Sequence, residues 1–128
     1  MDRNAFRKAV EARDLDQMMQ HFTEDAELHS PVTFKPFEGR AAIRQLFGIL
    51  IEVFEDFYYT DQLEDGDGTT LGLVFRARVE GRDAEGLDLL RFNPEGLIRD
   101  ITVMVRPRSA LEALLAQVGA RLASAQAE

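Results

Sequence analysis

One acidic residue, Asp88, lies where an apolar residue would be expected. The segment Gly86–Phe92, GLDLLRF, has the period-two alternation of a strand, which places Asp88 and Leu90 on the same face. Both faces of this strand are mostly apolar, so the carboxyl is expected to be partly removed from water, which raises a carboxyl pKa. Asp88 is therefore the main candidate for a functional polar group. The alternative is a structural aspartate held by a backbone amide or by an arginine such as Arg76 or Arg91.

The two histidines, His21 and His29, are the other groups that titrate near neutral pH. His29 lies between Leu28 and Ser30 in a short predicted strand, so it points away from any pocket that Ser30 faces. This favours a place at a rim or an interface, although at pocket depth His29 would be the natural general base. Two separated histidines in a chain without cysteine predict neither a metal site nor a disulfide framework.

Phenylalanines recur at positions that the predicted elements turn inward. Most are expected to form the core, and some to line an apolar ligand cavity. Phe34 and Phe37 lie in an irregular segment, 31–39, and are the candidates for the mouth of that cavity. The full set of expected ligand-binding residues is Phe6, Phe22, Phe34, Phe37, Phe47, Phe75, Leu90 and Val103.

The elements that must position these residues follow from periodicity and turn signals. Helices are predicted over 3–12, over 40–53 and from Ser109 onward. A further helix is predicted to begin at Asp14, which caps it, and to include Phe22 on its apolar side. Strands are predicted over 26–30, 57–64, 71–79, 86–92 and 97–105, the last four joined by short turns. Helices followed by a run of strands predict an α+β fold, a bent antiparallel sheet with three helices over its concave face and the last helix near an edge.

Length and charge limit the classes of partner. The 128 residues are expected to form a single domain, residues 1–128, and the net charge of −8 disfavours nucleic acid and anionic membranes. No secretory signal is recognisable, and the longest apolar run, 47–51, is too short to span a membrane. The expected location is therefore cytoplasmic. No nucleotide loop or nucleophile elbow is present, so no cofactor is predicted.

Three segments resemble the SnoaL-like family of the nuclear transport factor 2-like superfamily: RDLDQMMQHFTEDAELHSPV, FEGRAAIRQLF and DLLRFNPEGLIRDITVMVRP. The resemblance spans nearly the whole chain and implies a cone-shaped α+β fold. The superfamily includes ketosteroid isomerases, limonene-epoxide hydrolases, polyketide cyclases and dehydratases. The resemblance therefore implies the fold much more strongly than the reaction.

Ketosteroid isomerases give the most detailed comparison. The position of their general-base aspartate is Ser30 here, that of their oxyanion-hole tyrosine is Phe6, and that of their oxyanion-hole aspartate is Asp88. Serine is not a useful base at neutral pH and phenylalanine donates no hydrogen bond, so isomerisation by that mechanism is not expected. The resemblance implies instead that a neutral Asp88 donates to a ligand carbonyl. The epoxide-hydrolase arrangement is absent too, because Arg76-Ala77-Arg78 and Val103 occupy its positions.

These observations predict a protein that binds a hydrophobic small molecule in an apolar cavity containing Asp88. One alternative is an isomerase, cyclase or dehydratase acting on a hydrophobic carbonyl compound, with Asp88 as acid or donor and His29 or Ser30 and a water as helpers. The other is a dimeric interaction module without a ligand. The missing base and tyrosine favour binding over catalysis.

The last predicted strand carries a mixed outer face. Asp100, Thr102 and Met104 lie on this face, and they alternate along the strand with Ile101, Val103 and Val105 on the other face. A sheet face that is neither fully polar nor fully apolar often packs against a second copy of itself. The sequence therefore predicts a homodimer through the outer face of the sheet.

Overall fold

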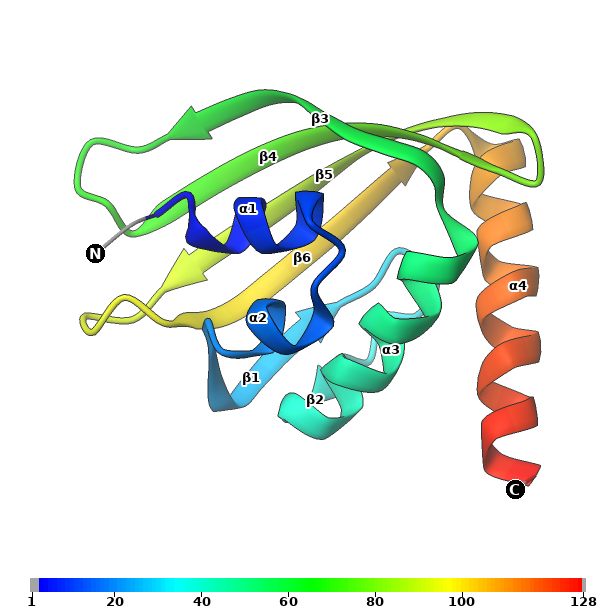
Figure 1. Ribbon diagram of the computed structural model, residues 1–128, viewed down its shortest axis with the longest axis horizontal. Helices are drawn as coiled ribbons and strands as arrows, with labels where there is room; N and C mark the ends of the chain where they lie inside the picture. The colour runs from blue at the N-terminus through cyan, green and yellow to red at the C-terminus, as the bar shows by residue number, and fades with distance from the viewer. Residues whose placement is uncertain (1–2, 128) are drawn as a thin grey trace.

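The computed structural model describes residues 3–127, which form a curved sheet with helices on its concave side (Figure 1). The helices are α1 (Ala5–Glu11), α2 (Leu15–Met19), α3 (Arg40–Val53) and α4 (Arg108–Ala127). The strands are β1 (Phe22–His29), β2 (Phe37–Glu38), β3 (Glu55–Glu64), β4 (Thr70–Val79), β5 (Arg82–Phe92) and β6 (Ile98–Arg106). The α+β class predicted from the sequence is confirmed.

The six strands have the order β2-β1-β6-β5-β4-β3. From β3 to β6 they form the predicted antiparallel meander, whereas β1 pairs with β6 in parallel. This parallel pair departs from the fully antiparallel sheet that the sequence predicted. It arises because α2 and a short turn bring the chain back to the edge of β6, where the Ile98 amide donates to the His21 carbonyl at 2.7 Å.

Two elements near the N-terminus differ from the prediction. Phe22 was expected on the apolar side of the second helix, but α2 ends at Met19 and Phe22 begins β1, paired with Ile98. The helix is short because strand pairing with β6 satisfies the backbone from His21 onward. The segment predicted to be irregular also contains β2, in which Phe37 pairs with Leu28.

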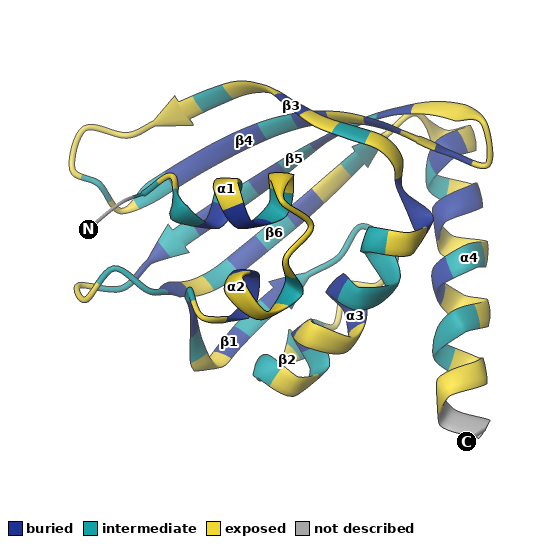
Figure 2. Cartoon of the chain, in the orientation of Figure 1, coloured by how far each residue is buried: buried dark blue, intermediate teal, exposed yellow. Residues whose placement is uncertain are grey.

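The core lies between the sheet and the helices. Buried residues run along the inner faces of β4, β5 and β6, and the buried sides of α3 and α4 face the sheet (Figure 2). α4 contacts α3 and the ends of β4, β5 and β6, and contributes Ala110, Ala113, Leu114 and Val118 to the core. No helix among the described residues is long and apolar enough to cross a membrane.

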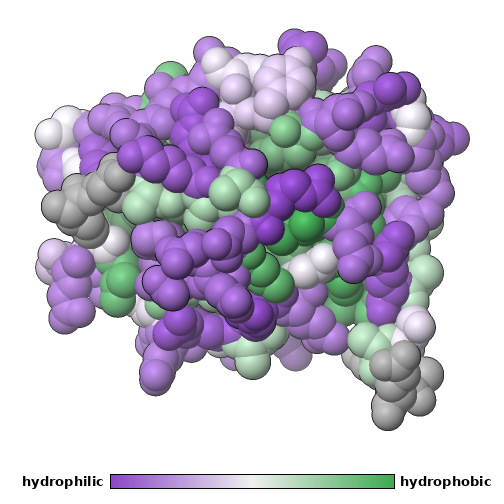
Figure 3. Space-filling view, viewed as in Figure 1, coloured by the Kyte–Doolittle hydropathy of each residue, from purple (hydrophilic) through white to green (hydrophobic). Residues whose placement is uncertain are grey.

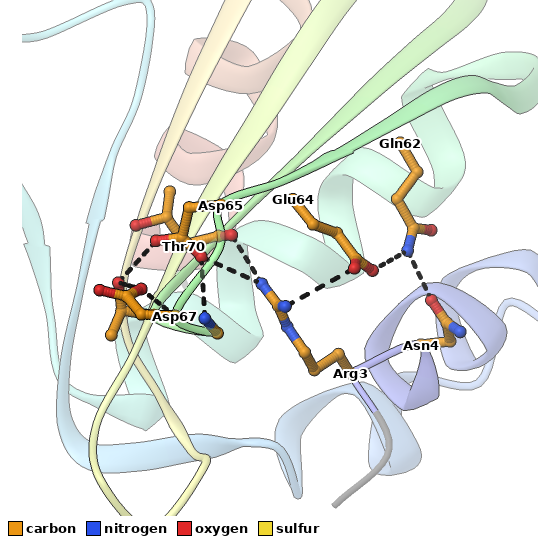
Figure 4. Close-up of polar contacts among 9 residues, drawn as sticks. Arg3, Asn4, Gln62, Glu64, Asp65, Asp67 and Thr70 are labelled. Atoms are coloured by element: carbon orange, nitrogen blue, oxygen red, sulfur yellow. Dashed lines mark hydrogen bonds and ion pairs between the residues drawn. The ribbon is translucent and has the colours of Figure 1, made fainter.

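A polar network holds the start of α1 against the turn between β3 and β4 (Figure 4). The Arg3 guanidinium donates to the Thr70 carbonyl at 2.7 Å and lies 3.6 Å from carboxyl oxygens of Glu64 and Asp65. Gln62 on β3 donates to the Asn4 side chain at 2.7 Å. These contacts fix α1 across the concave face, where it forms one wall of the cavity described below.

Candidate functional site

An apolar cavity of about 110 Å³ lies between the helices and the sheet. Figure 3 shows hydrophobic surface in a recess beside the C-terminal end of α1, bordered by hydrophilic side chains. The walls come from all three N-terminal helices and from strands β3 to β6. The lining residues are Phe6, Val10, Glu11, Arg13, Met18, Phe47, Leu50, Ile51, Phe54, Phe57, Tyr59, Phe75, Asp88 and Val103.

Asp88 is the only buried charged side chain among the described residues. It lies in the middle of β5, between Leu73 of β4 and Val103 of β6, and alternation turns it to the concave face with Leu90. Burial raises the pKa of the Asp88 carboxyl from 3.8 to about 7, and a hydrogen bond from Tyr59 partly opposes the shift. Near neutral pH this group therefore exists in both protonation states.

Tyr59 is the side-chain partner of Asp88, and sequence analysis missed it. Its hydroxyl donates to the Oδ2 atom of Asp88 at 3.1 Å. Burial first, and then the neighbouring Asp88 carboxylate, raises the pKa of Tyr59 well above its usual value of 10.0, so the phenol keeps its proton at neutral pH. The alternation of Phe57 and Tyr59 in β3 was the available signal, since it places both residues on the concave face.

The arginines considered as structural partners of Asp88 lie elsewhere. Arg76 pairs with Glu85 at 3.3 Å, and Arg91 pairs with Asp100 at 3.5 Å. Both belong to the opposite parity of their strands, on the outer face of the sheet. Within the part of the chain that the structure describes, Asp88 thus has a phenol partner and no cationic one.

Aromatic rings surround the Asp88–Tyr59 pair. Phe57 stacks on Phe75 with ring centroids 4.8 Å apart and meets Tyr59 edge to face at 5.1 Å. The Arg7 guanidinium lies over the Tyr59 ring at 5.4 Å from its centroid. The pair is thus a small polar site in apolar walls, where a hydrogen bond to a ligand is stronger than it would be in water.

The expected ligand-binding residues fall into two groups. Phe6, Phe47, Phe75 and Val103 line the cavity with Asp88. The other four do not. Phe22 packs in the core against Phe6 and Phe47, Leu90 is fully buried farther along β5, Phe37 lies in β2, and Phe34 is fully exposed on a loop. The predicted mouth is wrong because β2 carries the 31–39 segment to the far edge of the sheet.

The other two candidates for catalysis do not reach the cavity. In the register of β1 with β6, His29 is opposite Thr102, whereas Leu28 is opposite the buried Ile101. His29 therefore shares the outer face with Thr102. The Ser30 hydroxyl accepts hydrogen bonds from the amides of Val32 and Thr33, both at 3.3 Å, and so serves a turn. The described residues also hold no group of three metal-binding side chains.

The sequence profile of the SnoaL-like domain family matches residues 3–101. The chain belongs to the SnoaL-like family. This confirms the resemblance drawn from the sequence segments. Among curated proteins, no sequence match is found.

Solved structures similar to this SnoaL-like protein include several with described ligands or activities. A steroid delta-isomerase from Pseudomonas aeruginosa is 39% identical over 96% of this chain and 90% of its own, with a TM-score of 0.90. The epoxide hydrolase/cyclase-like enzyme SalBIII, of pyran ring formation in the polyether salinomycin, is 25% identical over 84% and 88%, with a TM-score of 0.65. A Mycobacterium tuberculosis protein in complex with estradiol-17β-hemisuccinate is 15% identical over 84% and 92%, with a TM-score of 0.66, a likeness of fold alone.

Proposed function

We propose that this SnoaL-like protein binds a hydrophobic small molecule whose carbonyl or hydroxyl oxygen meets the Asp88–Tyr59 pair. The observation that carries the proposal is a buried carboxyl, bonded on one oxygen by a phenol, in an otherwise apolar cavity. Tyr59 occupies Oδ2, which leaves Oδ1 for a ligand. When protonated, Asp88 donates to a ligand carbonyl, and when ionised it accepts from a ligand hydroxyl.

The size of the cavity limits the part of the ligand that enters. Its volume of about 110 Å³ is below the roughly 150 Å³ of an engineered protein cavity that binds benzene. Pockets that hold drug-sized ligands have volumes of about 300–1,000 Å³. We therefore propose that a single ring, or a chain of similar size, reaches Asp88 while the rest of a larger ligand lies at the mouth.

An isomerase is the second candidate function. The observation in its favour is the 39% identity to a steroid delta-isomerase, together with a pKa of about 7 for Asp88, which suits proton transfer at neutral pH. The ketosteroid isomerase mechanism needs a base at the position of Ser30 and a tyrosine at that of Phe6. In this chain Asp88 itself is left to exchange the proton, with Tyr59 to orient it.

A ligand panel tests the binding proposal. Wild-type protein is heated with 4-alkylcyclohexanones, cyclohexenones and steroids at pH 6, where Asp88 is mostly protonated. A compound present at one hundred times its dissociation constant is expected to stabilise the fold by about 2.7 kcal/mol, which raises Tm by several degrees. Replacing Asp88 with leucine removes the donor and is expected to weaken binding of a ketone about 10- to 100-fold, because one buried hydrogen bond is lost.

Two further variants sharpen this test. Tyr59→Phe keeps the ring and removes the hydroxyl, so a smaller loss of affinity is expected than for Asp88→Leu. Asp83→Asn, an exposed aspartate on the same strand, is the matched control and should bind like wild type. If no compound shifts Tm of the wild type, the binding proposal fails and a dimeric interaction module becomes the better description.

The homodimer remains a proposal for the outer face of the sheet. Val74, Leu87 and Met104 lie side by side there on β4, β5 and β6, and Met104 is 50% exposed. Sedimentation at micromolar concentration is expected to give a dimer that Met104→Arg converts to a monomer. Leu115→Arg on α4, at a residue 48% exposed, is the control. A monomeric wild type would remove the proposal.

A further inference from the structure

We infer that Arg13, at the mouth of the cavity, selects ligands that carry a carboxylate beside the ring that enters. This inference rests on the proposed ligand-binding function and names the class of ligand more closely. It predicts a molecule with a carbonyl or hydroxyl oxygen at one end, for Asp88 and Tyr59, and an anionic group at the other.

The backbone of Arg13 has an unusual conformation. Arg13 lies between α1 and α2 with φ of 56°, in the left-handed region that a residue with a Cβ atom seldom adopts. Its amide donates to the Val10 carbonyl at 2.9 Å and that of Asp14 donates to the Ala9 carbonyl at 3.0 Å, which ends α1. Glycine or asparagine is the usual residue at such a helix end. Arg13 therefore has a backbone conformation that is unfavourable for an arginine.

The side chain of Arg13 reaches across the mouth. Its Nη2 atom donates to the Ile51 carbonyl, in the last turn of α3, at 2.7 Å. Arg13 and Ile51 both line the cavity, so this contact joins its two rims. The guanidinium has five N–H donors, and this is its one side-chain hydrogen bond within the described residues. Donors remain for a ligand.

Arg13 is the charged side chain at the mouth whose charge no neighbouring carboxylate offsets. Glu11 also lines the cavity, but its carboxylate lies 3.6 Å from the Nε atom of Arg7, so these two charges offset each other. Arg13 has no ion pair with any described carboxylate. In a protein of net charge −8, the cavity mouth therefore carries a local positive charge. A guanidinium pairs with a carboxylate through two parallel hydrogen bonds, which makes a carboxylate its natural ligand group.

The cavity size places the anionic group near this arginine. A volume of about 110 Å³ leaves room for no more than one ring, so a substituent on that ring extends to the mouth. An anion deeper inside would meet apolar walls, Asp88 and a Tyr59 hydroxyl that already donates to Asp88, and these surroundings disfavour a negative charge. The carboxylate and the ring oxygen are thus expected at opposite ends of the ligand.

A matched pair of ligands tests the inference. Calorimetry at pH 6 compares 3-(4-oxocyclohexyl)propionate with its methyl ester, which differ in charge and share the ring ketone. Wild-type protein is expected to bind the acid about fivefold more tightly than the ester, and the ratio should fall toward one in 0.5 M salt. Arg13→Gln keeps a polar side chain with N–H donors and removes the charge. It is expected to bring the ratio of the two affinities to about one, because the acid loses more affinity than the ester.

The controls separate the inference from the function on which it rests. Arg82→Gln, at an exposed arginine of β5 away from the cavity lining, should keep the wild-type ratio. If wild type binds both compounds equally, or if Arg13→Gln keeps the preference for the acid, the inference is wrong and the binding proposal stands. If neither compound binds wild type while neutral cyclohexanones also fail, both are overturned. If Arg13→Gln weakens the acid and the ester by the same factor, the arginine acts only by holding α3 and the inference is wrong.

Discussion

Replacing Asp88 with asparagine is expected to make the protein more stable at pH 8, by as much as about 4 kcal/mol. The folded pKa of Asp88 is raised to about 7 from an ordinary value of 3.8. Between these two pH values the folded state binds more protons than the unfolded state. Wild type therefore loses stability as pH rises from about 4 through 7. The variant does not, because its amide at this position stays neutral.

Urea denaturation from pH 4.5 to 8.5 measures this difference. The two free energies of unfolding should be similar near pH 4.5 and diverge until about pH 8. Asparagine is isosteric and can still accept from Tyr59, so the comparison isolates the charge. Asp83→Asn on the same strand should follow wild type throughout. Parallel curves for wild type and Asp88→Asn would mean that the carboxyl is hydrated in the folded protein.

The cost of Asp88 bears on its role. A carboxyl that lowers stability at neutral pH, where an amide or leucine of similar size would not, is typical of residues kept for function. The protonation state of Asp88 should also change the affinity for ligands. The affinity of wild type for a neutral ketone is expected to fall above pH 7 as the donor is lost, whereas Asp88→Asn keeps an amide donor and should bind the ketone independently of pH.

Gly86→Ala is expected to destabilise the fold by about 3 kcal/mol or more. A Cβ atom at Gly86 would lie 2.1 Å from Cζ of Phe75 and 2.6 Å from the backbone oxygen of Met104. The ring is packed against Phe54 and Phe57 in the cavity wall, and the carbonyl belongs to the β5–β6 pairing, so neither moves aside without loss of these contacts. Thermal and urea unfolding measure the loss, and ligand binding should weaken with it.

Two comparisons test the steric explanation. Gly119→Ala on α4 meets nothing within 4 Å and should stabilise the protein by about 0.5–1 kcal/mol, as alanine does in a helix. Phe75→Leu shortens the side chain at the point of contact. The double variant Gly86→Ala/Phe75→Leu should therefore lose less stability than the sum of the two single variants. Additive losses would place the strain at the Met104 carbonyl instead.

Local patterns in the sequence determined much of the fold. The apolar stripe over 40–53 predicted α3 at its observed bounds, and Asp14 accepts from the Gln17 amide at the start of α2 as predicted. Alternation along β5 placed Asp88 and Leu90 on one face. These features depend on residues within one or two turns or strand steps of each other, so a single sequence is sufficient to find them.

The tertiary structure alone decided what surrounds Asp88. The Tyr59 hydroxyl contacts Asp88 across β4, although the two residues are 29 positions apart in the sequence. The pairing of β3 with β4 is irregular around Tyr59. Phe22 left its predicted helix for a strand because β6, far along the chain, offered parallel pairing. Arg13 lies at the cavity mouth because α1 ends there and its side chain donates to the Ile51 carbonyl of α3. Such contacts depend on which distant segments meet and in what register, and no local pattern of residues encodes that.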